Sequence, residues 1–368
     1  MSTATKTAVR HAPAVSVPRQ ARELVEELVS FLRDPALGDP DQYEVVETRL
    51  EGLKGVVRSI EEQLAGATDE LRAVQHWFRE ETNPLFFQSG FGRRIRTWPE
   101  GHPGDCVTLE QIYRNEPSSE GIGRHLDRYL LSRTLAVAVR SRMRMLSRLL
   151  CRRARVEAGG GNWLNLGCGS CRELLALDDD SPNRTIHLVD LDRNALEFSK
   201  NLLAGKKIGT VHFVPENALR FSRADRSLQR FGAFTTIYSA GLFDYLEDGT
   251  LAKLMGGLYR SLADGGLLIA PFKDKHRYDT FDYHWLSQWH FFLQRAEPDY
   301  WAMLAEAGIP QHAVRTERDD TGVILCFLIT KSAAPPVPQD SATPPAEQDQ
   351  GGAVWRVDPG DGNQGTAG

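Results

Sequence analysis

The feature that most constrains this fold is a regular alternation of strand and helix patterns in the second half of the chain. Five short apolar runs are separated by segments with helical periodicity, which indicates parallel strands joined by right-handed crossovers. Two further runs, residues 313–319 and 322–330, are joined too tightly for a crossover helix and predict a hairpin whose last strand is antiparallel to its neighbours. The sequence therefore predicts an α/β, Rossmann-like seven-stranded sheet ending in an antiparallel hairpin. The five earlier strands are expected at residues 162–166, 184–190, 211–214, 234–239 and 267–271.

A glycine-containing turn follows the first expected strand. Residues 167–171 read GCGSC, and a helix is expected to begin at about residue 172. Gly167 allows a sharp turn, and Gly169 lets a ligand approach the backbone at the start of a helix. Asp190 lies 21 residues beyond Gly169, at the end of the second strand. An acid at that distance binds a ribose diol in dinucleotide-type folds, so these residues predict a cofactor cradle.

Position 172 helps to distinguish two cofactors for this cradle. NAD prefers a third glycine there, and the sequence has Arg172. S-adenosylmethionine (SAM) carries no phosphates, and its class I enzymes end in an antiparallel hairpin. The pattern therefore favours SAM over NAD. The pair Cys168 and Cys171 has no second pair or nearby His-x-His to complete a metal site, so no metal is expected.

Several motifs resemble known methyltransferases. GCGSCRE, VDLD, PENAL and YSAGLFDYLED, in that order and spacing, resemble class I SAM-dependent methyltransferases. Upstream, WPEGHPGDCVTLEQIYR and LSRTLAVAVRSR are similar to the methyltransferases of 3-hydroxypalmitic acid methyl ester biosynthesis, which make a bacterial quorum-sensing factor. The likeness runs from about residue 76 to residue 330.

This resemblance implies a set of residues that bind SAM. The glycine turn lines the methionine arm, and the acid after the second strand binds the ribose hydroxyls. The loop after the third strand meets the adenine, and the end of the fourth strand lies beside the sulfonium. Asn217 is equally well interpreted as a turn residue after Pro215. The expected cofactor-binding residues are Gly167, Cys168, Gly169, Asp190, Leu191, Asn217, Ala218, Ser239 and Ala240.

The region before the sheet is expected to be helical. Residues 1–20 are interpreted as a disordered start, and residues 21–157 as a helical region that forms a lid and contributes to the acceptor site. Apolar residues recur at steps of three and four from residue 43 to residue 78, which predicts one long helix. Asn83-Pro84 is expected to end it. The apolar seam of this helix is interpreted as packing on its own domain, with a homodimeric coiled coil as the alternative.

The rest of the chain is divided by its composition. Residues 84–124 are rich in glycine, proline and aromatics and are expected to be irregular, while residues 125–153 predict a second long helix. Residues 158–331 are expected to form the SAM-binding domain, and residues 332–368 a disordered tail. One face of the second helix is basic, which is typical of a solvated or ion-paired surface and less often of a nucleic-acid surface. Its arginines are Arg140, Arg144, Arg148 and Arg152.

The methyl acceptor is expected to bind between this helical region and the sheet. An aromatic block spans residues 272–301, and its part from His284 to Leu293 is interpreted either as one wall of an apolar pocket or as plain core. Arg140 is the expected carboxylate partner, because it lies in the family-like AVRSR stretch and arginine binds carboxylates bidentately. The other candidates for acceptor contact or catalysis are His102, Asp105 and Tyr113.

Composition limits the function further. The net charge of −5 gives no general attraction to nucleic acid, and the fourth strand lacks the Asn/Asp-Pro-Pro-aromatic motif of nucleobase amine methyltransferases. Five cysteines, an odd and low number, favour a reducing cytoplasm, and no apolar run is long enough to span a membrane. We expect a SAM-dependent methyltransferase for a small-molecule acceptor, a carboxylate or a hydroxyl or amine of a fatty-acid-like or natural-product intermediate. The alternatives are a nucleic-acid or protein methyltransferase and a non-catalytic scaffold that associates through the helix at residues 43–78.

Overall fold

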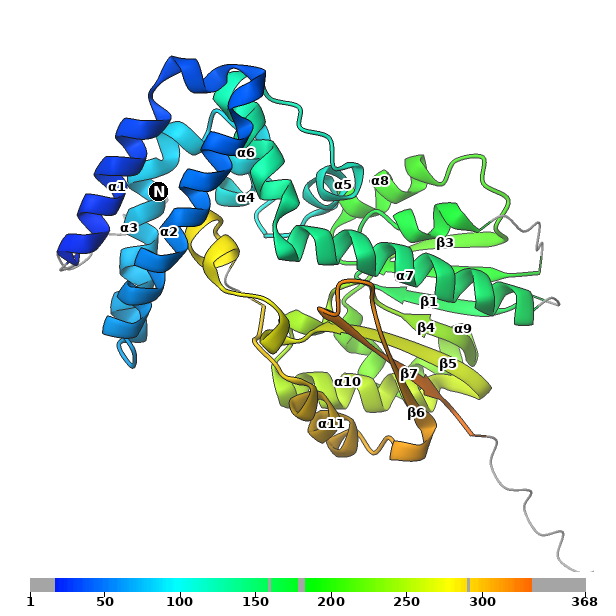
Figure 1. The fold of residues 1–368 in the computed structure, drawn as a ribbon. Coiled ribbons are helices and arrows are strands. Elements are labelled where there is room, and N and C mark those ends of the chain that lie inside the picture. The colour runs from blue at the N-terminus through cyan, green and yellow to red at the C-terminus, as the bar shows by residue number, and fades with distance from the viewer. Residues whose placement is uncertain (1–16, 158–159, 178–182, 290–291, 333–368) are drawn as a thin grey trace, which may run out of the picture. The chain divides into compact units, whose positions relative to one another are not determined.

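Seven strands form one sheet in the second half of the chain (Figure 1). They are β1 (Asn162–Leu166), β2 (Thr185–Asp190), β3 (Thr210–Pro215), β4 (Phe234–Tyr238), β5 (Leu262–Lys273), β6 (Val314–Arg318) and β7 (Ile324–Thr330). Their order is β3-β2-β1-β4-β5-β7-β6. β7 is antiparallel to both β5 and β6, and the other pairs are parallel. The predicted α/β fold with its C-terminal hairpin is confirmed.

The computed structural model describes most of the chain. The described residues are 17–157, 160–177, 183–289 and 292–332. The segments expected to be disordered, residues 1–20 and 332–368, lie almost entirely outside the described residues.

Helices cover both faces of the sheet because each face is apolar. Met145, Leu146 and Leu149 of α7 pack with Trp163 of β1 on one face, together with the apolar side of α8. Leu251 and neighbouring residues of α10, with α11, cover the other face. The helices concerned are α7 (Thr134–Val156), α8 (Arg193–Leu202), α9 (Ala224–Phe231), α10 (Asp248–Ser261) and α11 (Glu297–Glu306).

The helix expected after β1 is only a short 3-10 helix, Arg172–Ala176. It begins at the residue that the sequence predicts. α7, which precedes β1 in the chain, already covers this part of the sheet (Figure 1). The glycine turn therefore opens directly beneath α7.

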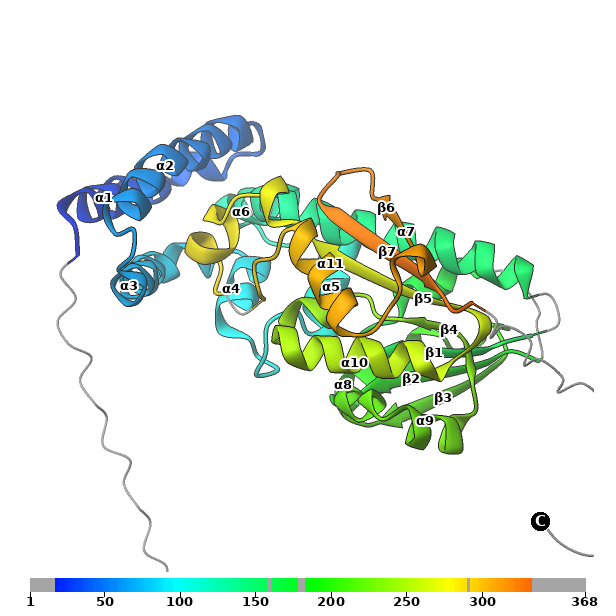
Figure 2. The ribbon, with the colours of Figure 1, turned by 90° about the horizontal axis from the view of Figure 1, so that it is seen from below.

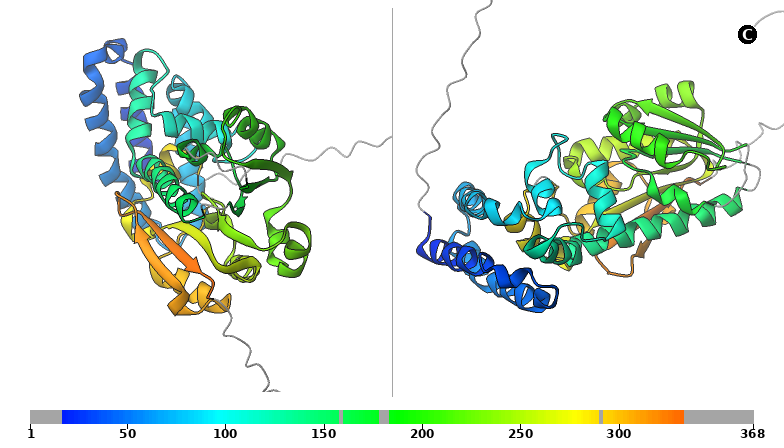
Figure 3. Two further views of the ribbon diagram at one scale, coloured as in Figure 1. Left: turned by 90° about the vertical axis from the view of Figure 1, so that its right-hand side faces the viewer. Right: turned by 90° about the horizontal axis from the view of Figure 1, so that it is seen from above.

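Within the described residues, six α-helices precede α7 and build a second apolar core (Figure 2). They are α1 (Arg19–Leu32), α2 (Tyr43–Gln63), α3 (Thr68–Phe86), α4 (Gly90–Thr97), α5 (Cys106–Arg114) and α6 (Gly121–Ser132). α1, α2 and α3 lie at the end farthest from the sheet, whereas α4 and α5 lie near it (Figure 3). The described residues contain no helix long and apolar enough to cross a membrane.

The single long helix predicted at residues 43–78 is wrong, because the chain breaks between α2 and α3. Gly66 has φ of 89°, which ends one helix and lets the next turn away. Val46, Leu50, Val57 and other seam residues are buried in the chain's own helical core. The apolar stripe on which the dimer hypothesis depends is thus covered by neighbouring helices of the same chain.

Three other helix boundaries differ from the sequence expectation. α3 continues through Pro84 to Phe86, since a proline this close to a helix end leaves few helical hydrogen bonds unmade. Residues 84–124 are not irregular, because α4 and α5 begin there at the capping side chains of Ser89 and Asp105. The helix predicted at residues 125–153 is divided at Arg133, whose backbone is extended.

Candidate active site

The glycine turn and the end of β2 are joined into one cradle by Asp190. Its Oδ2 accepts a hydrogen bond from the backbone N–H of Gly169 at 3.0 Å, and its Oδ1 accepts one from Asp192 at 3.0 Å. Gly167 and Gly169 have φ of 59° and 56°, a left-handed conformation that favours glycine. A Cβ on Gly167 would lie 3.1 Å from Cβ of Leu242, so a side chain there would crowd the cradle.

The donor and acceptor set of this cradle fits SAM. Each carboxylate oxygen of Asp190 keeps a lone pair for a ribose hydroxyl after holding the two loops in place. Asp192 accepts a hydrogen bond at 2.8 Å from the N–H of Asn194 and caps α8, as the sequence predicts. The charge of Arg172 is already paired and is not directed at a phosphate, because its Nη1 pairs with Glu110 of α5 at 2.5 Å.

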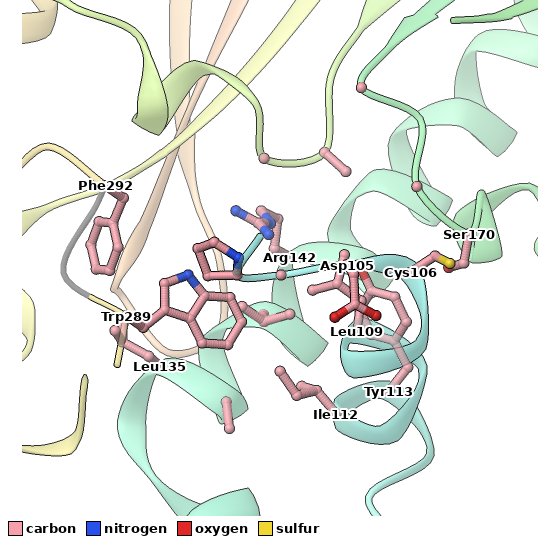
Figure 4. A pocket seen from close by; sticks show the side chains of 18 of the residues that line it. Asp105, Cys106, Leu109, Ile112, Tyr113, Leu135, Arg142, Ser170, Trp289 and Phe292 are labelled. Atoms are coloured by element: carbon pink, nitrogen blue, oxygen red, sulfur yellow. The ribbon is translucent and has the colours of Figure 1, made fainter. Parts of the chain in front are cut away.

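A cavity of about 400 Å³ continues from the cradle toward the N-terminal helices (Figure 4). Its lining comes mainly from the loop before α5, from α5 and α7, from the glycine turn, from the segment after β4 and from Trp289 and Phe292. Most of the lining is apolar, and Leu109, Ile112, Leu135, Trp289 and Phe292 surround it in Figure 4. The cavity is therefore a largely apolar chamber with the cradle at one end.

Two cations share one carboxylate at the wall of this chamber. Lys273, the last residue of β5, pairs with Oδ2 of the buried Asp244, and Nη1 of Arg142 lies 3.9 Å from the same oxygen. That Nη1 atom is buried and has no hydrogen-bond partner among the described residues. Burial, together with the charge of Arg142, lowers the pKa of Lys273 below its usual value despite Asp244. Asp244 can balance only one of these two cations, and Arg142 also acts on the buried Glu173.

Glu173 is a second buried charged group in the lining. Its Oε1 accepts hydrogen bonds from the hydroxyl of Tyr238 at 2.9 Å and from Nδ2 of Asn165 at 3.2 Å. Burial raises the pKa of Glu173 to about 7, although these hydrogen bonds and Arg142 favour its ionised form. The carboxyl group thus titrates near neutral pH.

Comparison with known proteins agrees with the geometry of the cradle. Residues 164–268 match the family model described as a methyltransferase domain. The chain contains a SAM-dependent methyltransferase domain. Its cofactor is SAM, as the sequence predicts, and the matched residues include the glycine turn and Asp190.

Solved structures resemble this methyltransferase in fold. A possible exported protein from Bordetella parapertussis is 22% identical and has a TM-score of 0.53, and the match covers 67% of this chain and 85% of that one. An O-methyltransferase family protein from Burkholderia thailandensis is 17% identical with a TM-score of 0.40, over 56% and 61% of the two chains. Magnesium protoporphyrin IX methyltransferase from Synechocystis is 12% identical with a TM-score of 0.41, over 61% and 95%. No protein of curated function matches the sequence.

Only part of the predicted cofactor-binding set of this methyltransferase lies in the cradle. The glycine turn, Asp190 and Ala240 line the cavity. Ser239 is fully buried, and its Oγ accepts a hydrogen bond at 3.2 Å from the N–H of Leu242, so it shapes the turn after β4. Leu191 is 72% exposed beyond the lining.

The predicted adenine contacts also lie outside the lining of the cavity. Asn217 is exposed and caps the 3-10 helix Ala218–Ser222 by accepting a hydrogen bond at 2.9 Å from the N–H of Leu219. Ala218 packs against the core beneath that helix. Asn217 therefore acts as a turn residue in this structure, the alternative that the sequence left open, and its contact with adenine stays a prediction.

Among the predicted acceptor residues, His102 and Tyr113 line the cavity. Nε2 of His102 lies 3.7 Å from Asp192, which places the loop before α5 next to the cradle. Asp105 caps α5 and pairs with Arg94 at 2.5 Å. Burial favours its protonated form, but hydrogen bonds from Thr108 and Arg94 hold the pKa of Asp105 below its usual value. Asp105 is thus an ionised structural cap in the cavity wall.

Arg140 does not reach the cavity. Its Nη1 donates hydrogen bonds to the carbonyl oxygens of Leu131 at 2.9 Å and Ile112 at 3.4 Å. The cavity arginine is Arg142, which the sequence reasoning missed although it lies in the same AVRSR stretch. The helical phase contained the signal, because Arg142 falls three residues after the buried Val139 and four before the buried Leu146.

Most residues of the basic face of α7 lie on the surface, whereas those of the aromatic block lie partly in the core and partly in the cavity wall. Arg148 and Arg152 of α7 are exposed and face Asp320 and Glu317, at 3.7 and 3.2 Å, which agrees with the solvated and ion-paired interpretation. In the aromatic block, Trp289 and Phe292 line the cavity, while Trp285 is buried in the N-terminal core. No group of three or more metal-ligating side chains occurs in the described part of the chain.

Proposed function

We propose that this methyltransferase methylates a small, largely apolar carboxylic acid whose carboxylate is bound by Arg142. The observation that carries the proposal is the buried Nη1 of Arg142, which lacks a hydrogen-bond partner among the described residues. Asp244 already pairs with Lys273, so an anion entering the chamber would give the buried Nη1 of Arg142 the hydrogen-bond partner that it lacks.

The shape of the chamber supports a small acceptor. A volume of about 400 Å³ is in the range of small-molecule sites, and the walls are formed mainly by aliphatic and aromatic side chains. Nucleic acid would require an open cationic groove, whereas Arg148 and Arg152 are paired with acids on the outer surface. The apolar walls suit a fatty-acid-like or natural-product acid. A purely scaffolding role would explain neither the buried Arg142 in the chamber nor the cradle formed by the glycine turn and Asp190.

The residues of the site divide the work of the reaction. The glycine turn and Asp190 hold the cofactor, Arg142 orients the acceptor, and Trp289, Leu109 and their neighbours exclude water from the reacting groups. When bound, SAM supplies an activated methyl carbon, and the electrons of its broken C–S bond stay with sulfur. A carboxylate brings its own lone pair and has no proton to lose, so the site needs no general base for this acceptor.

A single-turnover transfer of labelled methyl from SAM tests this proposal. The acceptors are a series of aliphatic and aryl carboxylic acids, each paired with its primary amide and alcohol, and bulk RNA and protein. We expect label only in acids. Arg142→Gln should lower kcat/KM by a factor corresponding to about 2–4 kcal/mol while SAH (S-adenosylhomocysteine) affinity is kept.

The exposed Arg144 on the same helix provides the matched control, and Arg144→Gln should leave transfer unchanged. Label that appears in RNA or protein and in none of the acids would reject the small-acid acceptor. Equal transfer to acids and amides, with no effect of Arg142→Gln, would reject the carboxylate contact.

A further inference from the structure

Glu173 lies where the cradle meets the two central strands. It follows the glycine turn in the 3-10 helix Arg172–Ala176, yet its side chain is held by Asn165 on β1 and Tyr238 on β4. Its backbone carbonyl accepts a hydrogen bond at 3.0 Å from the hydroxyl of Ser147 on α7. Contacts from three elements therefore fix this residue, which is only 2% exposed and lines the cavity, and two of them hold its carboxyl group.

The charge of this carboxyl group is only partly balanced inside the protein. Arg142 of α7 is the cation that acts on it, but Arg142 also faces Asp244. From the other elements, Tyr113 and Glu110 of α5, Cys171 of the turn and Tyr238 of β4 face the same region. None of these four supplies a positive charge. A ligand with a cationic group beside the glycine turn would complete the balance.

We propose that Glu173 binds the α-ammonium group of the cofactor's methionine arm and releases a proton to solvent when the cofactor binds. The methionine arm of SAM carries such a group, and the glycine turn lies between Asn165 and Glu173 in sequence. By contrast, Asp244 follows β4, Lys273 ends β5 and Arg142 lies on α7, and we assign this cluster to the acceptor.

The proton balance follows from the titration of Glu173 near pH 7. The ionised carboxylate pairs with the ammonium, whereas the neutral acid does not, so binding below that pH transfers one proton from Glu173 to the buffer. The ammonium keeps its own proton, and no oxidation or bond cleavage is involved. Cofactor affinity should therefore rise with pH up to about 7 and level off above it.

Calorimetry with two ligands isolates the ammonium contact. SAH carries the methionine-derived amino acid, and 5′-methylthioadenosine keeps the adenosine and the thioether but lacks it. Between about pH 5.5 and about pH 7.5, SAH affinity should rise roughly tenfold, with proton release seen as a buffer-dependent enthalpy. The affinity of 5′-methylthioadenosine should stay constant.

Two variants make the test specific. Glu173→Gln should weaken SAH binding and abolish the pH dependence of SAH affinity. Its affinity for 5′-methylthioadenosine should be unchanged, which would also show that the variant is folded. Tyr238→Phe removes one hydrogen bond to the ionised carboxylate and should shift the SAH profile to higher pH.

Three outcomes would overturn the proposal. One is SAH binding that does not depend on pH in the unaltered protein. Another is a Glu173→Gln variant whose affinities for SAH and 5′-methylthioadenosine fall by the same factor. The third is a pH dependence confined to the methyl-transfer rate, which would make Glu173 a base for the acceptor. Since no acceptor is present in the binding experiment, it does not depend on the proposed carboxylic acid.

Discussion

The guanidinium of Arg142 occupies the space where a side chain at Gly241 would begin. A Cβ built on Gly241 would lie 2.9 Å from Nη2 and 3.2 Å from Nη1 of Arg142. Gly241 follows β4 and lines the cavity next to Ala240. The absence of a side chain at one position thus determines where the cavity's arginine can lie.

Gly241→Ala should therefore displace Arg142 and impair acceptor use. We expect kcat/KM to fall by roughly tenfold, or about 1.4 kcal/mol, with SAH affinity little changed. Steady-state kinetics and SAH calorimetry measure the two effects. Gly249→Ala is the control, because a Cβ there meets no atom within 4 Å. Unchanged kinetics in Gly241→Ala would mean that Arg142 does not contact the acceptor.

Asp190→Ala should weaken cofactor binding more than it impairs use of the acceptor. The side chain holds both cradle loops and is the expected partner of the ribose hydroxyls, so SAH binding should lose about 2 kcal/mol. Calorimetry checks this against Asp264→Ala, an exposed acid away from the cradle. Binding of NADH in place of SAH would contradict the assignment of the cradle.

Trp289→Ala should open the chamber on the acceptor side. The ring lies close to Gly104, at 2.9 Å from a Cβ built there, and its Nε1 donates a hydrogen bond to Tyr245 at 2.7 Å. We expect acceptor kcat/KM to fall by roughly tenfold or more while SAH affinity stays the same. Trp301→Ala, which alters the core under α11, should lower Tm without this selective kinetic loss. If Trp289 has only a structural role, Trp289→Ala should behave like Trp301→Ala and lower Tm without a selective loss of acceptor kcat/KM.

His187 should make the fold less stable in mild acid. Burial, with smaller effects from His212 and Arg230, lowers the pKa of His187 to about 4. The unfolded chain takes up this proton below about pH 6.5 and the folded chain does not, so stability is lost as the pH falls from there toward about 4. His187→Leu should remove up to about 2 kcal/mol of that decline in denaturant titrations. His276→Gln, at an exposed position, should keep it.

Local pattern was sufficient for the sheet and for the cradle. β1 and β2 agree with the predicted strands within about one residue, because each is a short apolar run bounded by turn residues, whereas β5 begins five residues before the predicted strand, at Leu262. Gly167, Gly169 and Asp190 could be assigned together because neighbouring parallel strands bring their carboxyl ends to the same edge of the sheet. The hairpin of β6 and β7 followed from the short connection between them.

The helical boundaries and the acceptor wall could not be obtained in the same way. A continuous apolar seam predicts one helix at residues 43–78, but Gly66 divides it, and the packing of α1 and α3 against α2 decides that it folds back. The covering of one face of the sheet at β1 by α7 is likewise decided by packing. Such competition between elements for one face of a sheet leaves no local signal.

The sequence by itself determined the class of fold, the cofactor and the edge of the sheet where the glycine turn meets Asp190, since these depend on short local patterns in the chain. Only the tertiary structure decided that Arg142 and not Arg140 enters the chamber, and that it faces Asp244 and Lys273 from two other elements. Arg140 is instead satisfied by the carbonyl oxygens of Leu131 and Ile112. Neighbouring arginines on one helix point in different directions, and the chemistry of each is set by the partners that packing brings to it.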